Sequence, residues 1–170
     1  KLSRGLGDVY KRQQLEVLLE NSGLRDGIEY IQQGKDLGLK SEEGKRLKPD
    51  FVVKLPDDKH VIIDAKATLS SFVDHSQEED IERKHKVLKQ FLKSIKSHVD
   101  DLSTKHYHSA AGLTSPDFVF MFIPIEGAFH LASQNGLGQN DNMMTYAWDR
   151  KVVMAGPSTL LAAPVSYTHL

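Results

Sequence analysis

The fold of this chain is decided by the stretch Pro49-Asp50-Phe51-Val52-Val53-Lys54-Leu55, Pro56-Asp57-Asp58-Lys59, His60-Val61-Ile62-Ile63-Asp64-Ala65-Lys66. Its two outer segments are short, apolar and rich in β-branched residues, which favour strands. The segment between them is polar and begins with proline, which is typical of a turn. We therefore predict two antiparallel strands joined as a hairpin.

One end of this predicted hairpin gathers two carboxylates and an amine. A four-residue turn, 56–59, places Asp50 roughly opposite Ala65, so the carboxylate of Asp50 is expected near that of Asp64. Because side chains alternate along a strand, Asp64 and Lys66 project to the same face. Two such carboxylates suit Mg²⁺ or Mn²⁺, and an ammonium group beside the metal can stabilise charge on a phosphate. The pattern predicts a site able to cut a phosphodiester bond.

The tripeptide at the end of the second strand is a weak signal by itself. An acid, any residue and then lysine occurs five times in this chain. Only Asp64-Ala65-Lys66 closes an apolar strand whose partner strand begins with an acid, Asp50. The alternative interpretation is a pair of exposed charges at a strand end, which is common and contributes little to stability.

Length and composition indicate one soluble domain. The chain has 170 residues, of which 39 % are hydrophobic and 26 % charged, with a net charge of −1 at pH 7; such values are ordinary for globular proteins. The lack of cysteine excludes thiol catalysis, disulfides and cysteine-based zinc sites. No apolar run approaches the roughly 20 residues of a spanning helix, and residues 1–5 do not resemble a signal peptide. We expect a cytoplasmic domain that makes no membrane contact.

Helices and strands alternate along the rest of the chain. Hydrophobic periodicity and turn residues predict helices over 14–21, 77–105, 128–133 and 143–148, a helix capped by Ser158, strands over 28–33, 117–125 and 151–155, and a connection over 68–76. The unbroken apolar run 118–123 indicates a central strand covered on both faces. Together with the hairpin, this pattern predicts an α/β sandwich with a mixed sheet.

The long helix over 77–105 combines an apolar stripe with a basic surface. The stripe consists of Ile81, His85, Leu88, Leu92, Ile95, Val99 and Leu102. From Arg83 to His98 the charged residues are Arg83, Lys84, Lys86, Lys89, Lys93 and Lys96, with no acid among them. Such a surface is either a solvated helix face or a surface that binds phosphates, and the sequence leaves both open.

Other polar and aromatic candidates are weaker. His106 and His108 flank Tyr107, but two residues apart on a helix they face different directions, so we interpret them as surface histidines. No neighbouring motif makes Ser70 or Ser71 part of a hydrolase triad. Glu126 is either a neighbour of the site or a structural cap. Trp148 is expected in the core rather than as a platform for bases.

Five blocks of sequence point to a known family. They are Leu47–Val53, Val61–Lys66, Ser97–Tyr107, Ser115–Glu126 and Gly156–Leu161. In this order they resemble the DNA recombination protein RmuC family of the PD-(D/E)xK nuclease superfamily. The resemblance covers residues 14–163 and implies a restriction-endonuclease-like core, a mixed central sheet flanked by helices.

The resemblance also implies an activity. It puts Asp50, Asp64 and Lys66 on the family's motif positions and implies a Mg²⁺- or Mn²⁺-dependent deoxyribonuclease acting on DNA in recombination or repair, with Asp50 and Asp64 as metal ligands. His98 and Lys105 fall on a family block and are candidates to face DNA.

Two departures from the family pattern keep other functions open. The family's first helix carries a Gly-x-Trp-Gly-Glu stretch whose acid can complete the metal site, and residues 1–13 do not match it. A non-catalytic DNA-binding or scaffolding domain, or a hydrolase of smaller phosphate esters, is therefore an alternative. Residues 1–13 and 164–170 resemble translated adapter sequence, and we expect them to be non-native.

Overall fold

The computed structural model describes residues 2–21, 25–28, 30–32, 50–54, 60–65, 70–104, 118–138 and 142–159. Its helices and strands alternate much as the sequence predicts. In chain order they are α1 (Leu2–Asn21), β1 (Tyr30–Gln32), β2 (Phe51–Lys54), β3 (His60–Ala65), α2 (Ser70–Gln77), α3 (Ile81–Thr104), β4 (Val119–Phe122), α4 (Glu126–Ser133), α5 (Met143–Asp149) and β5 (Val152–Ala155).

The five strands form one mixed sheet in the order β1-β2-β3-β4-β5. β1, β2 and β3 pair antiparallel, whereas β3, β4 and β5 pair parallel. β4 is buried along its whole length between β3 and β5. The predicted hairpin, the central strand and the α/β class with a mixed sheet are thereby confirmed.

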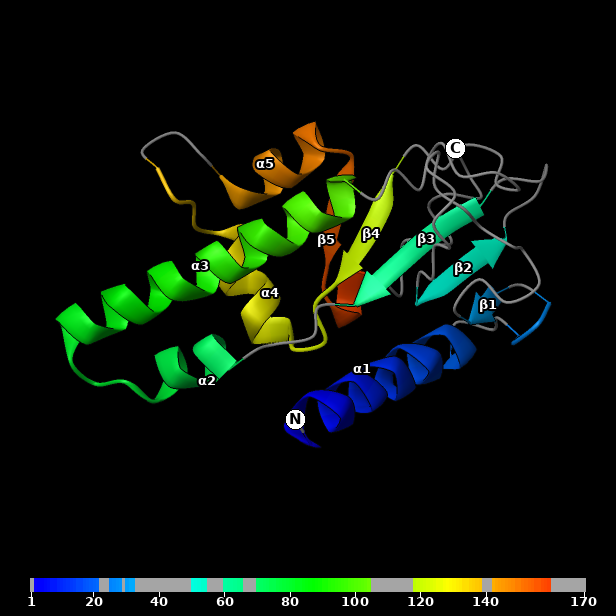
Figure 1. Ribbon diagram of the computed structural model, residues 1–170, viewed down its shortest axis with the longest axis horizontal. Coiled ribbons are helices and arrows are strands. Elements are labelled where there is room, and N and C mark those ends of the chain that lie inside the picture. The colour runs from blue at the N-terminus through cyan, green and yellow to red at the C-terminus, as the bar shows by residue number, and fades with distance from the viewer. Residues whose placement is uncertain are drawn as a thin grey trace.

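Each face of the sheet has its own core. On one face, Leu15 and Leu19 of α1 pack with alternate strand residues such as Phe51, Ile63 and Phe122. On the other face, α3, α4 and α5 cover the intervening strand residues, among them Val52, Ile62 and Met121. Figure 1 shows α1 below the sheet and α3 and α5 above it. Helices on both faces leave the strand ends as the places where polar side chains can gather.

The long helix α3 begins after Asp80, whose Oδ1 accepts a hydrogen bond from the N–H of Arg83 at 3.0 Å, as an N-cap does. Its buried residues are Phe91, Leu92, Ile95, Val99 and Leu102. The predicted stripe is wrong at its first turns, because Ile81 is 74 % exposed and His85 is exposed as well. Figure 1 shows the reason, since the N-terminal half of α3 extends past the sheet together with α2.

Two other boundaries differ from the sequence prediction. Residues 70–77 form α2 where a connection was predicted; this helix buries no residue fully and rests on α3 through the rings of Phe72 and Phe91, 6.1 Å apart. Without buried positions it had no hydrophobic period to detect. α1 begins at Leu2 rather than at residue 14. The prediction started from the cluster Leu15–Leu19 and did not extend back through the earlier apolar residues Leu2, Leu6 and Val9.

After β5, residues 157–159 are helical, so the last helix begins at Pro157 rather than after a Ser158 cap. Proline is favoured at the first position of a helix. Among the described residues, none of the helices combines the length and the apolar character needed to cross a membrane.

Candidate functional site

The hairpin register brings the two predicted metal ligands face to face. Phe51 pairs with Ile63 in the antiparallel ladder, so one further step along the same register places Asp50 opposite Asp64. The prediction that Asp50 lies opposite Ala65 is wrong by one residue. Lys54 pairs with His60, which leaves residues 55–59 as the connection, one residue more than the four-residue turn assumed.

Asp50 and Asp64 are also unusual in their burial. They are 9 % and 8 % exposed, and they are the only buried polar or charged residues in the part of the chain that the structure describes. Carboxylates are rarely buried without a compensating charge or hydrogen bonds, because removing them from water is costly. Two of them at the mouth of one hairpin therefore mark a place that attracts positive charge.

Part of that positive charge comes from α1. The Nε of Arg12 lies 3.6 Å from Oδ1 of Asp50, with the two side chains 40 % and 13 % exposed. On the same helix, Nε2 of Gln14 donates to the carbonyl oxygen of Pro124, just past the end of β4, at 2.9 Å. Helix α1 thus reaches the edge of the sheet where β3 and β4 end.

The composition of this edge suits a hard divalent cation. Mg²⁺ keeps several waters and commonly uses only one or two protein carboxylates, so Asp50 and Asp64 fit its requirements. Within the described ranges, no group of three or more acidic or histidine side chains is placed to hold a metal ion. Lys66, the third predicted site residue, lies outside the described residues, and its placement beside Asp64 stays a prediction.

Glu126 lies at the same edge, but its carboxylate binds a backbone N–H group. Its Oε2 accepts a hydrogen bond from the N–H of Ser158 at 3.1 Å, and its Oε1 lies 3.5 Å from Nε2 of His130. A Cβ added to Gly156 would lie 2.9 Å from Oε2 of Glu126. The hydrogen bond to Ser158 joins the segment that follows β4 to the segment that follows β5, which agrees with the interpretation of Glu126 as a structural cap.

The remaining sequence candidates do not join this edge in the described residues. Trp148 is 56 % exposed on α5 and stacks on Phe118 with ring centroids 4.5 Å apart, so its prediction as a core residue is wrong. His98 is half-buried on α3. Ser70 and Ser71 form the first turn of α2. Residues 105–108, which include Lys105, His106 and His108, lie outside the described residues.

Sequence reasoning missed Arg12 and a polar cluster between α3 and α5. Arg12 precedes the buried Leu15 and Leu19 by three and seven residues, a spacing that places all three on one helix face. A first helix predicted to begin before residue 12 would have placed Arg12 on the same face as these leucines.

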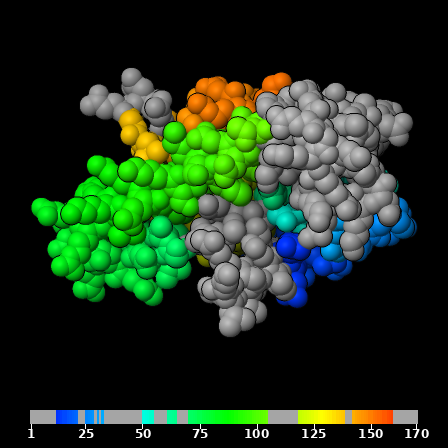
Figure 2. Space-filling model, viewed as in Figure 1, coloured from blue at the N-terminus to red at the C-terminus, as the bar shows by residue number. Residues whose placement is uncertain are grey.

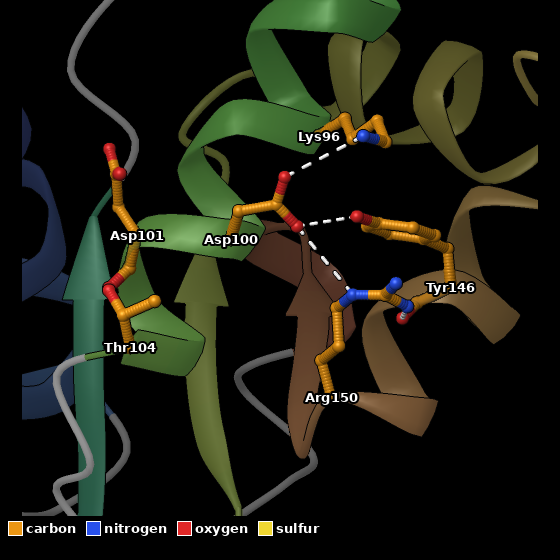
Figure 3. Close-up of polar contacts among 6 residues, drawn as sticks. All are labelled: Lys96, Asp100, Asp101, Thr104, Tyr146 and Arg150. Atoms are coloured by element: carbon orange, nitrogen blue, oxygen red, sulfur yellow. Dashed lines mark hydrogen bonds and ion pairs between the residues drawn. The ribbon is translucent and has the colours of Figure 1, made fainter.

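The polar cluster is centred on Asp100 (Figure 3). The hydroxyl of Tyr146 donates to Oδ1 of Asp100 at 2.5 Å, and Nε of Arg150 and Nζ of Lys96 lie 3.6 and 3.7 Å from its two oxygens. The guanidinium carbon of Arg150 also lies 3.4 Å from the centroid of the Tyr146 ring. The i,i+4 pair of Lys96 and Asp100 is visible in the sequence, but the contact with Tyr146 is not, because Tyr146 lies 46 residues from Asp100.

Comparison with known proteins places these observations in a family. The model of the RmuC family matches residues 12–169. The chain belongs to the RmuC family. No solved structure gives a significant match to it.

Curated RmuC relatives share well over a third of the aligned residues. A DNA recombination protein RmuC homolog of Neisseria meningitidis is 41 % identical over 149 residues, which cover 87 % of this chain and 24 % of the relative. The homolog of Pseudomonas aeruginosa is 40 % identical over 148 residues (87 % and 31 %), and RmuC of Salmonella typhimurium is 37 % identical over 146 (86 % and 29 %). The chain therefore spans about a quarter to a third of the length of these RmuC proteins.

Proposed function

We propose that this RmuC domain is a Mg²⁺- or Mn²⁺-dependent deoxyribonuclease that serves DNA recombination, built on a restriction-endonuclease-like core. The printed names of the relatives, DNA recombination protein RmuC, support the recombination role. The mixed sheet, with an antiparallel hairpin continued by parallel strands, is compatible with that core.

The observation that carries the proposal is the pair formed by Asp50 and Asp64. Each is nearly fully buried, and the register of β2 and β3 sets them opposite each other at the mouth of the hairpin. The pair concentrates carboxylate oxygens at one end of the hairpin, and hard oxygen ligands of this kind are those that Mg²⁺ and Mn²⁺ bind. This concentration of oxygen ligands supports a divalent-cation site.

The residues of the chain would divide the work as follows. Asp50 and Asp64 would hold the metal through their carboxylate oxygens. The metal, when bound, lowers the pKa of an attacking water and neutralises charge that develops on the phosphate. Lys66 would place its ammonium group against the same phosphate, where a compact charge is well suited to the task.

Arg12 does not prevent this arrangement. Its side chain is 40 % exposed, and its Nε lies 3.6 Å from Oδ1 of Asp50. Such partly exposed ion pairs contribute about 1 kcal/mol or less, so a divalent ion can displace the guanidinium.

Purified protein incubated with labelled linear, branched and single-stranded DNA, with Mg²⁺ or with EDTA, tests the proposal. We expect cleavage only with the metal, and its loss in Asp64→Asn and Lys66→Ala. Asp74→Asn is the matched control, because Asp74 is exposed on α2. Cleavage that persists in Asp64→Asn, or that proceeds in EDTA, would overturn the assignment.

A non-catalytic DNA-binding domain is the second candidate. It is favoured by the lack of a third acidic or histidine ligand beside the aspartates within the described residues. DNA binding without cleavage in the same experiment would establish it. Hydrolysis of a small phosphodiester without action on DNA would instead indicate a hydrolase of smaller phosphate esters.

A further inference from the structure

The basic residues of α3 fall on two flanks of the helix. At about 100° per residue, Lys86, Lys89, Lys93 and Lys96 lie within roughly 80° of one another. We call this row the lysine stripe. Phe91, which contacts α2, lies about 200° from Lys89 around the helix axis. The stripe therefore lies on the flank of α3 away from α2.

The lysine stripe is open to solvent. Lys86, Lys89 and Lys93 are exposed, and the Lys96 side chain is 43 % exposed. Among the described residues, no carboxylate forms an ion pair with Lys86, Lys89 or Lys93, whereas Lys96 pairs with Asp100. Figure 2 shows the atoms of α3 at the surface along the helix, with those of α5 beside its C-terminal part.

A fifth cation extends the stripe across to α5. Arg150 lies beside Asp100 and over the Tyr146 ring, and its Nη1 donates to the carbonyl oxygen of Tyr146 at 3.1 Å. Lys96 also lies 5.2 Å from the centroid of that ring. The two cations share a single carboxylate, so the cluster keeps a net positive charge and holds Arg150 in a fixed position (Figure 3).

The spacing of these cations fits a polyanion with closely repeated charges. Lys86 and Lys96 are ten residues apart, which is about 15 Å along a helix. Over that length a DNA duplex presents roughly nine phosphates, at one charge per ~1.7 Å. Glu82 and Asp100 lie in line with the stripe at its two ends, so the uninterrupted basic length runs from Arg83 to Val99.

We propose that the lysine stripe and Arg150 form a DNA-backbone binding surface separate from the hairpin mouth. The surface contacts phosphates and reads no sequence, because lysine side chains act as point charges. This inference rests on the proposed role on DNA but not on cleavage. The two surfaces lie on different elements, because Asp50 and Asp64 lie at the start of β2 and the end of β3, whereas the stripe lies on the flank of α3 away from α2. The domain would hold DNA along α3 whether or not Asp50 and Asp64 cut it.

The test measures binding of a fluorescent DNA duplex by anisotropy, in EDTA, over a range of salt concentrations. Lys89→Gln/Lys93→Gln removes two charges from the stripe, and Gln keeps the helix propensity close to that of Lys. Lys54→Gln/Lys84→Gln is the matched control. It removes two charges from exposed positions off the stripe. Lys84 lies on the α2 side, where burial and, after it, the charge of Lys84 lower the pKa of His75.

We expect the stripe variant to lose roughly tenfold or more in affinity at 0.15 M salt, and its salt slope to fall by about two, since each phosphate contact contributes about 0.9. The control should bind like the parent. Equal losses of affinity in both variants, or an unchanged affinity of the stripe variant, would overturn the proposal. So would a parent protein that binds polyglutamate, a polyanion without phosphates, in preference to DNA.

The outcome is independent of catalysis. The binding is measured in EDTA, so it does not depend on metal-assisted cleavage. Cleavage lost in Asp64→Asn with normal binding by the stripe variant would refute the surface and keep the nuclease. DNA binding that depends on the stripe, without any cleavage, would support the surface and refute the nuclease.

Discussion

Arg12 on α1 faces Asp50 at the start of β2, with Nε 3.6 Å from Oδ1. A guanidinium in this position opposes the binding of a second cation to the same carboxylate. We predict that Arg12→Gln raises the affinity for Mn²⁺, by roughly tenfold for a unit charge about 5 Å from a divalent ion. Isothermal titration calorimetry measures the change, with Arg83→Gln on the exposed start of α3 as the control. An unchanged or weaker affinity would show that Asp50 does not bind the metal.

The hydrogen bond between Tyr146 and Asp100 should join α3 to α5. We predict that Tyr146→Phe lowers the free energy of unfolding, and that Tyr146→Phe and Asp100→Asn show a coupling of about 1 kcal/mol in a double-mutant cycle, since both groups are partly exposed. Urea denaturation gives these values. Asp101→Asn is the control, because Asp101 is exposed and points away from the cluster (Figure 3). Additive effects of the two variants would contradict the prediction.

Gly156 leaves no room for a side chain between β5 and α4. A Cβ there would lie 2.9 Å from Oε2 of Glu126 and 3.0 Å from the Phe129 ring. We predict that Gly156→Ala destabilises the fold by about 1–3 kcal/mol, as overpacking commonly does. In contrast, Gly127→Ala meets only the edge of Phe72 at 3.2 Å and gains helix propensity in α4, so it should cost much less. Thermal unfolding compares the two, and equal melting temperatures would refute the steric argument.

Tyr30 should make the protein sensitive to alkali. Its ring is fully buried against Phe51, and its hydroxyl has no hydrogen-bond partner among the described residues. Burial, with added repulsion from Asp26, raises the pKa of Tyr30 from 10.0 to about 12. Above pH 10 the unfolded chain releases this proton while the folded chain keeps it, so stability falls as the pH rises from 10 to 12.

The variant Tyr30→Phe removes this titration. We predict that its free energy of unfolding declines less than that of the parent between pH 10 and pH 12, and that the variant is at least as stable at pH 7, because no unpaired hydroxyl is buried. Urea denaturation at several pH values measures both. Parallel pH profiles of the two proteins would contradict the assigned pKa.

The sequence predicted those elements whose burial follows a simple period. The apolar run 118–123 marked β4 because both faces of that strand are covered, and Leu92, Ile95 and Val99 marked α3 because they meet the sheet. α2 escaped prediction because its stability comes from a single surface on α3. Its apolar Val73 is 43 % exposed and so contributes no inward stripe.

The candidate site was predicted in composition but not in detail. Asp50 and Asp64 could be paired from sequence because strands carry their ends to a common edge. The register that sets them opposite each other could not be predicted, because it depends on one extra residue in the connection between Lys54 and His60. Arg12 was missed because the predicted helix started at residue 14, although Leu2, Leu6 and Val9 before it are already spaced by four and three residues.

The sheet order β1-β2-β3-β4-β5 repeats the order of the strands in the chain. During synthesis on the ribosome, each new strand can therefore add to the one that emerged just before it. Among the five strands that the structure describes, none has to be inserted between two that have already paired, and each after β1 pairs with the strand that precedes it in the chain. The nascent domain can grow from β1 towards β5 with only a short unpaired edge exposed at any time, which limits the opportunity for misassembly.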